Sequence, residues 1–208
     1  QSELKTNNSD SKQKTLSEEF TLNDNIIEAT QIGNCFIAAT NKDGLLLIHQ
    51  RRAHKRILFE YFKNKLKNKQ GQSQQLLFPK KITLNNSEIE LINSLKQNLN
   101  AVGFIFKSNN LTVTITGIPP ECQEENLQIV IENLIKKFKN LEEIQTDGKH
   151  KLAKSLATSL AINKIKELNT KEIKLLLKEL FKCKTPSVCP SGKHTMINLK
   201  TNDLQKYF

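Results

Sequence analysis

Tryptophan is absent from the 208-residue sequence, tyrosine occurs only twice, and no apolar run approaches the roughly 20 residues of a membrane-spanning helix. The chain also has no P-loop, no G-x-G-x-x-G turn and no nucleophile motif around any serine. These absences exclude a membrane span, the common nucleotide-binding motifs and a serine hydrolase site. Cysteines are few and no secretory signal opens the chain, so we expect reduced thiols and a cytoplasmic protein. Because the first residue is Gln1 rather than Met, we expect a fragment of a longer protein.

Positive charge is what the sequence has in excess. It contains 32 Lys and Arg against 21 Asp and Glu, which gives a net charge of +11. A basic balance favours a polyanionic partner, nucleic acid first. Lys and Asn are abundant throughout, however, so a general compositional bias explains the charge equally well. With 37% hydrophobic residues, the chain can bury a core of ordinary size.

Strands and helices are expected to follow a polar N-terminal segment. Residues 1–19 lack periodicity, which predicts a disordered linker, with order beginning near Phe20. Strands over 35–40 and 45–50 should form a hairpin, in which the apolar run 45–48 is buried on both faces. Apolar spacing, capping signals and turn residues predict the other elements. These are helices near 53–68, 87–101, 124–139, 151–166, 171–182 and 202–208, a hairpin over 104–117 and a strand over 196–200. The mixture predicts an α+β fold.

Three segments of the sequence are informative because of their order along the chain. They are IHQRRAHKRILFE at 48–60, LAKSLATSLAI at 152–162 and CKTPSVCPSGK at 183–193. Together they resemble the C-terminal dimerisation domain of the DNA mismatch-repair protein MutL. The first resembles a family segment of the form I-D-Q-H-A-A-H-E-R-I-L-Y-E, the second an Ala-rich helix, and the third the element C-P-H-G-R-P. The resemblance covers about residues 20–208.

This resemblance implies a two-lobed fold. Residues 20–62 and 145–208 would form a dimerisation lobe, and residues 63–144 an inserted outer regulatory lobe. It also implies a homodimer, with a sliding clamp, the mismatch-recognition protein MutS and double-stranded DNA as partners, and no membrane contact. The family's ATPase domain, with its ATP and Mg²⁺, would lie upstream, so we expect no cofactor in this fragment.

In nuclease-competent members of that family, Asp, His and Glu of the first segment and Cys and His of the third bind a divalent metal. The resemblance places the following residues at the ligand-motif positions: His49, Arg51, Lys55, Glu60, Cys189 and Ser191. Arg51 and Lys55 add positive charge where donors are lost, and Ser191 replaces an imidazole. The resemblance therefore predicts a degenerate nuclease site, with no metal and no catalysis.

Two other interpretations of this region stay open. Several ligand-type residues could rebuild a metal site, which would make the chain a metal-dependent DNA nicking endonuclease with non-standard ligands. These residues are His49, His54, Glu60, Cys183, Cys189 and His194. Alternatively, a cationic group at the strand–helix junction contacts DNA phosphates or is simply solvated. This group is Arg51, Arg52, Lys55 and Arg56.

A short segment also resembles the clamp-binding peptide of MutL proteins. It is Gln74-Gln75-Leu76-Leu77-Phe78-Pro79. A glutamine can bond to the rim of a pocket while Leu and Phe enter it. The alternative is an edge strand that has Leu76 and Phe78 in the core and ends at Pro79.

These observations favour a homodimerising, partner-binding module of mismatch repair. Through the 1–19 linker it would hold two upstream ATPase domains together and raise their effective concentration. The nicking endonuclease is the rival hypothesis, and a basic nucleic-acid-binding domain of unrelated fold is a third.

Overall fold

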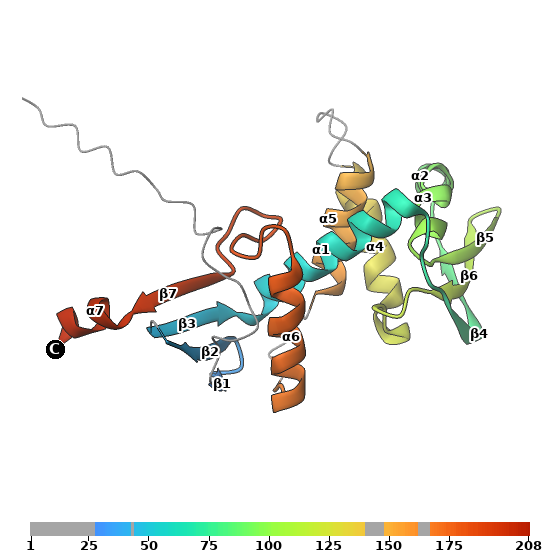
Figure 1. The fold of residues 1–208 in the computed structure, drawn as a ribbon. Coiled ribbons are helices and arrows are strands. Elements are labelled where there is room, and N and C mark those ends of the chain that lie inside the picture. Colours follow the sequence, from blue (N-terminus) through green and yellow to red (C-terminus); the bar gives the residue numbers. More distant parts are fainter. Residues whose placement is uncertain (1–27, 43, 140–147, 162–166) are drawn as a thin grey trace, which may run out of the picture.

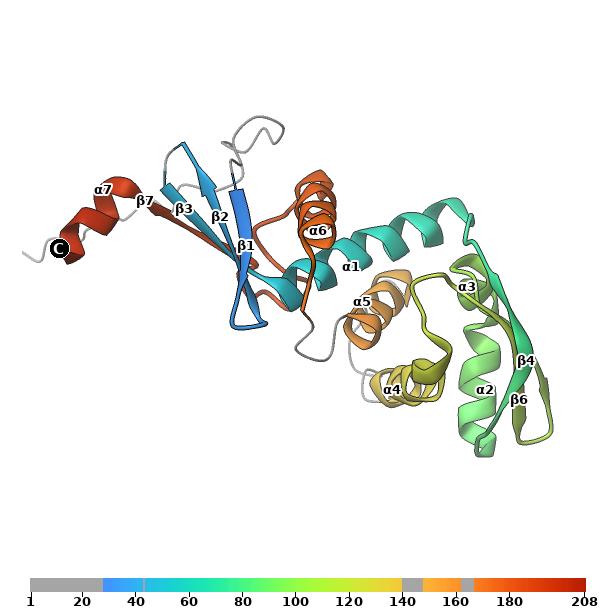
Figure 2. The same cartoon turned by 90° about the horizontal axis from the view of Figure 1, so that it is seen from below.

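Two antiparallel sheets joined by one long helix make up the architecture (Figures 1 and 2). The computed structural model describes residues 28–42, 44–139, 148–161 and 167–208. The predicted linker, 1–19, and the predicted start of order at Phe20 lie outside these ranges. Both sheets pack against helices, and the predicted α+β class is confirmed.

The first sheet has four strands in the order β1-β2-β3-β7, and all neighbours are antiparallel. Its strands are β1 (Glu28–Ile32), β2 (Phe36–Asn41), β3 (Gly44–His49) and β7 (Met196–Lys200). One face packs on α6 (Thr170–Lys182) and on Ala53 near the start of α1 (Gln50–Asn68). Alternate residues such as Leu46 and Ile48 are buried there, because successive side chains of a strand point to opposite faces.

The predicted burial of 45–48 on both faces is wrong for the single chain. Leu45 and Leu47 are only half-buried, and they lie on the face that α6 leaves uncovered. An unbroken apolar run does indicate two apolar faces, but within this chain a helix covers only one of them.

The second sheet has three strands in the order β4-β6-β5. These are β4 (Gln74–Thr83), β5 (Ile105–Asn109) and β6 (Thr112–Ile118), and the β5–β6 pair is the predicted hairpin. The helices of this part are α2 (Asn86–Ser94), α3 (Lys96–Ala101), η1 (Glu124–Asn126), α4 (Leu127–Lys139) and α5 (Gly148–Leu160). They bury one core together with the later turns of α1, and Figure 2 shows α5 beside α1 and α4 beside α5.

Helix α5 departs from the predicted lobe boundary. Residues 145–208 were expected to belong together, yet Leu152 and Leu156 of α5 lie in the core of the three-stranded sheet. Ala153 and Ala157 are fully buried, and their small side chains let α5 approach α1 and α4 closely. The described part of α5 ends at Leu160, and residues 162–166 of the predicted helix lie outside the described ranges.

Capping explains where two helices begin. Asn169 caps α6 as predicted, because its side chain accepts the backbone N–H groups of Lys171 and Glu172. The helix predicted at 87–101 is capped by Asn85, and it is divided at Leu95 into α2 and α3. The chain closes with α7 (Thr201–Leu204) and η2 (Gln205–Tyr207). Within the described ranges, none of the helices is long and apolar enough to cross a membrane.

Candidate functional site

The loop 183–195 lies along α1, and Arg56 and Glu60 of that helix hold the first half of the loop. The Glu60 carboxylate accepts the backbone N–H groups of Lys184, at 2.9 Å, and Thr185, at 3.4 Å. Arg56 lies 3.5 Å from Glu60 and donates from Nε to the Val188 carbonyl. Arg56 is buried, with 8% of its surface exposed. These two side chains therefore provide hydrogen-bond partners for backbone groups of the loop.

Two more α1 side chains hold the second half of the loop. Arg52 donates to the His194 carbonyl at 3.0 Å, and Lys55 Nζ donates to Ser191 Oγ at 2.8 Å. The tip of the loop is a tight turn in which the Cys189 N–H bonds to the Lys193 carbonyl and Gly192 has a φ of +78°. A side chain at position 192 would be strained, since that φ favours glycine. The turn thereby presents Ser191 to Lys55.

His49 ends β3 on the uncovered face of the four-stranded sheet. Its ring meets Phe36 edge-on, with 5.3 Å between ring centroids, and its Nδ1 is buried without a hydrogen-bond partner. Burial lowers the pKa of His49, and the charges of Arg52 and Arg51 lower it further, although a backbone hydrogen bond opposes them. The neutral imidazole is therefore favoured at this position.

The other predicted ligand-type residues have different surroundings from one another. The Cys183 thiol donates to the Glu179 carbonyl, and burial, together with the nearby Glu60 carboxylate, raises its pKa to about 12. Cys189 is buried in the loop, and His194 is exposed. Across the described ranges, no group of three or more His, Cys, Asp or Glu side chains is positioned to hold a metal ion.

Four basic side chains lie within electrostatic reach of Lys55, and together with Lys55 we call them the cationic cluster. Its members are Arg51 and Lys55 of α1, Lys137 of α4, Lys154 of α5 and Lys193 of the loop. Burial lowers the pKa of Lys55, and the charges of Arg51, Lys154 and Lys193 lower it too, whereas Cys189 opposes them. Burial and then Lys55, Lys154 and Arg51 likewise lower the pKa of Lys137.

The structure separates the residues that were predicted to contact DNA phosphates. Arg51 is exposed, but Arg52 and Arg56, which were also predicted as phosphate contacts, are engaged by the 183–195 loop. The cationic group predicted from the sequence did not include Lys137, Lys154 and Lys193, because they are far from Lys55 in the sequence. Only the packing of α5 on α1 and of α4 on α5 brings Lys137 and Lys154 close to Lys55.

The predicted clamp peptide opens β4, an edge strand. Leu76 is buried, while Leu77 is 84% and Phe78 is 72% exposed. Pairing with β6 shifts register between Gln75 and Lys80, so the apolar stretch lies in an irregularity of the ladder. The alternative of an edge strand is confirmed for the position of β4 and the burial of Leu76. It is wrong for Phe78, which lies outside the core, and the strand continues past Pro79 to Thr83.

A family model described as the MutL C terminal dimerisation domain matches residues 29–168. The chain belongs to this family. It is 36% identical over 180 residues to a DNA mismatch repair protein MutL of Flavobacterium johnsoniae, and these residues cover 86% of this chain and 28% of that protein. It is also 36% identical to the protein of the same name from Christiangramia forsetii, over 86% and 29% of the two chains. A third, from Prosthecochloris aestuarii, is 32% identical over the same shares. The chain thus spans less than a third of the length of these relatives.

Two predicted MutL ligand positions meet directly in the structure. Lys55 stands where the resemblance places a Glu, Ser191 stands where it places a His, and the two side chains are hydrogen-bonded. Glu60 is bonded to loop backbone, and His49 turns to Phe36. An ammonium group beside Ser191 repels a divalent cation, so these residues do not fit the metal that the family resemblance implies.

Proposed function

We propose that this chain is a homodimerising, partner-binding module of DNA mismatch repair. Membership of the MutL C-terminal family supports the proposal, as do relatives that carry the name DNA mismatch repair protein MutL. The four-stranded sheet with α6 serves as the dimerisation lobe. The three-stranded sheet, with α2 to α5, serves as the outer regulatory lobe. The module holds upstream ATPase domains together, and MutS and double-stranded DNA are further proposed partners.

The observation that carries the partner-binding role is the surface of β4. Two large apolar side chains, those of the consecutive residues Leu77 and Phe78, are exposed on an edge strand. Exposing them costs solvation free energy that burial in a partner's pocket recovers, at about 1.5–3 kcal/mol for each side chain. Gln74 and Gln75 precede them and are exposed, so their amides can bond to the rim of such a pocket. A sliding clamp with an apolar peptide pocket fits this segment.

A capture experiment tests the proposal. The Gln74→Ala/Leu77→Ala variant should lose binding to the immobilised sliding clamp and keep its melting temperature, because both side chains are exposed. Ile129→Ala is the matched control, since Ile129 is an exposed apolar residue of α4, and it should bind normally. Clamp binding by the double variant at the level of the unchanged chain would overturn the β4 assignment.

The uncovered face of the four-stranded sheet supports the homodimer. Along the antiparallel ladder, Ile32 lies opposite Phe36, Leu47 opposite Ile197, and Leu45 opposite Leu199. Ile32, Phe36 and Ile197 are exposed in the single chain that the structure describes. Contiguous apolar patches of this kind are typical of interaction surfaces. A second copy of the same face would cover them in a two-fold arrangement.

A further inference from the structure

The cationic cluster gathers positive charge from four segments of the chain at one place. At its centre, Lys55 bonds to Ser191 of the loop. Lys137, Lys154 and Lys193 come from α4, α5 and the loop itself, and Lys154 and Lys193 are exposed. Like charges gathered in one place repel one another, and a bound anion removes that repulsion.

Hydrogen-bond directions at the centre of the cluster also favour an anion. Lys55 Nζ donates to Ser191 Oγ, so the hydroxyl oxygen already acts as an acceptor. The hydroxyl keeps its own O–H to donate, and the ammonium group keeps two further N–H groups. The pair therefore presents donors. A phosphate oxygen is a fitting acceptor for them, and such charge-assisted bonds are stronger than neutral ones.

Electrostatics around the cluster agree with this geometry. Burial lowers the pKa of Lys55 and of Lys137, and the charges of neighbouring lysines and of Arg51 lower it further, as expected where positive charges repel one another. The net charge of +11 adds a long-range attraction for polyanions.

We propose that the cationic cluster binds the phosphodiester backbone of double-stranded DNA without a metal ion. Lys55 and Ser191 hold one phosphate, while Lys137, Lys154 and Lys193 contact phosphates beside it. The ammonium groups neutralise the charge of the DNA phosphates. The cluster offers hydrogen-bond donors and positive charge, which hold the DNA without cutting it. This inference rests on the mismatch-repair function proposed above and names the residues that contact DNA.

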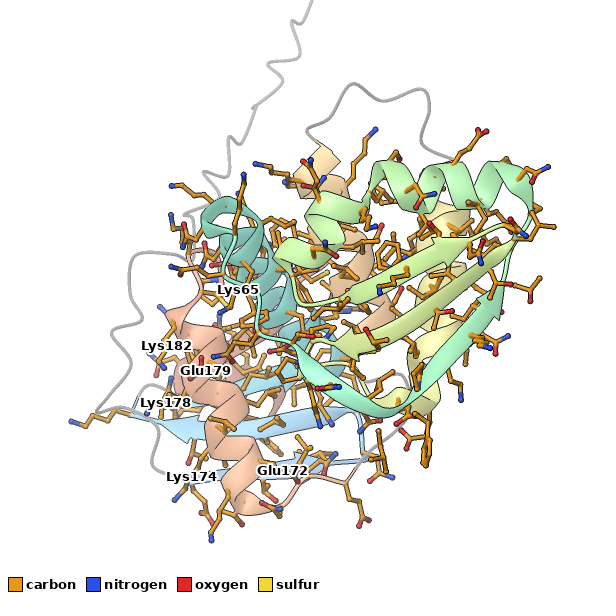
Figure 3. All side chains as sticks on the ribbon, turned by 90° about the vertical axis from the view of Figure 1, so that its right-hand side faces the viewer. Lys65, Glu172, Lys174, Lys178, Glu179 and Lys182 are labelled. Atoms are coloured by element: carbon orange, nitrogen blue, oxygen red, sulfur yellow. The ribbon has the colours of Figure 1, made fainter. Side chains whose placement is uncertain are left out.

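Fluorescence anisotropy of the 208-residue chain with a labelled duplex of arbitrary sequence, in EDTA, tests the inference. The test variant is Lys137→Gln/Lys154→Gln/Lys193→Gln. The matched control is Lys171→Gln/Lys174→Gln/Lys178→Gln, which removes the same charge from exposed positions of α6. Figure 3 labels Lys174 and Lys178 on that helix, and Figure 2 shows α6 and α5 on different sides of α1.

Between about 50 and 200 mM salt, the cluster variant should bind DNA at least roughly 10-fold more weakly than the unchanged chain. The slope of log affinity against log salt concentration should also become less steep, by about 0.9 for each lost phosphate contact. The α6 control should stay within about 3-fold, because only the general attraction changes. Replacing the same three cluster lysines with arginine should retain binding, because arginine also bonds phosphate. Equal losses in the cluster and α6 variants, or binding that disappears in EDTA, would overturn the inference.

Clamp capture and solution mass separate this inference from the function on which it rests. The cluster variant should keep both, because its three lysines lie neither on β4 nor on the four-stranded sheet. Loss of DNA binding alone supports the cluster. A chain that dimerises and binds the clamp, yet binds DNA equally well with and without the cluster, refutes the cluster and leaves the function standing.

Discussion

At the scale of single residues, two changes at the predicted MutL ligand positions are chemically complementary. A carboxylate replaced by Lys55 and an imidazole replaced by Ser191 leave a donor facing an acceptor, and the two are 2.8 Å apart. Lys55 thus puts a positive charge where the resemblance places a metal ligand, which converts a predicted cation site into one that carries a cation.

From this conversion we expect no specific Mn²⁺-dependent nicking of supercoiled plasmid by the chain. A unit charge about 4 Å from another contributes roughly 4 kcal/mol at an effective dielectric of 20, and a dication beside Lys55 meets that repulsion at least once. Cys189→Ala should leave any residual nicking unchanged, as should His49→Ala, which serves as its companion variant. Strong Mn²⁺-stimulated nicking that either substitution abolishes would refute the degenerate site and favour the nicking endonuclease.

At the scale of elements, α1 organises the site by holding the loop 183–195. Arg52, Arg56 and Glu60 recur at spacings of four residues, which places them on one face of the helix. All three bond to backbone atoms of the loop. The sequence shows Arg52 and Arg56 as part of a cationic run, and their use by the loop could not be predicted from composition or spacing.

Glu60→Gln should destabilise the chain by about 2–3 kcal/mol, because it removes charge-assisted bonds and leaves the largely buried Arg56 without its pair. Urea denaturation followed by circular dichroism measures the change. Glu90→Gln, at an exposed position of α2, is the control and should shift stability by no more than about 0.5 kcal/mol. An unchanged midpoint for Glu60→Gln would mean that α1 does not anchor the loop.

Elements with local signals were predictable from the sequence, and those that depend on packing were not. Asn169 and Glu172 mark the start of α6 because a capping box is local chemistry. The placement of α5 in the core of the three-stranded sheet depends on contacts with α1 and α4, which chain order does not reveal. The same holds for the site: position 55 was predictable from family spacing, whereas Lys137 and Lys154 reach it only through the fold.

At the scale of the whole molecule, exposed apolar surface occurs on both sheets. Leu77 and Phe78 lie on β4 of the three-stranded sheet, and Ile197 lies on β7 of the four-stranded sheet. Figure 1 shows these sheets at opposite ends of α1. A dimer formed through one sheet therefore leaves β4 on the other free to bind a partner.

The Ile197→Glu variant tests the dimer. Ile197 is 47% exposed in the single chain and lies opposite Leu47, so a glutamate there should be tolerated by the monomer. In a two-fold interface each copy would bury an unpaired carboxylate, at a cost of several kcal/mol per charge. We therefore expect light scattering to give about 24 kDa for Ile197→Glu, and twice the 23.8 kDa chain mass for the unchanged chain.

Leu77→Glu is the matched control, because it places the same charge on an exposed apolar position of the other sheet. It should remain dimeric while it loses clamp capture, whereas Ile197→Glu should keep clamp capture as a monomer with unchanged circular dichroism. If Ile197→Glu stays dimeric at micromolar concentration, the two copies associate through another surface. If the unchanged chain is itself monomeric, the homodimer proposal fails for this chain. The two glutamates thus assign dimerisation to one sheet and partner binding to the other, because each should abolish one association and preserve the other.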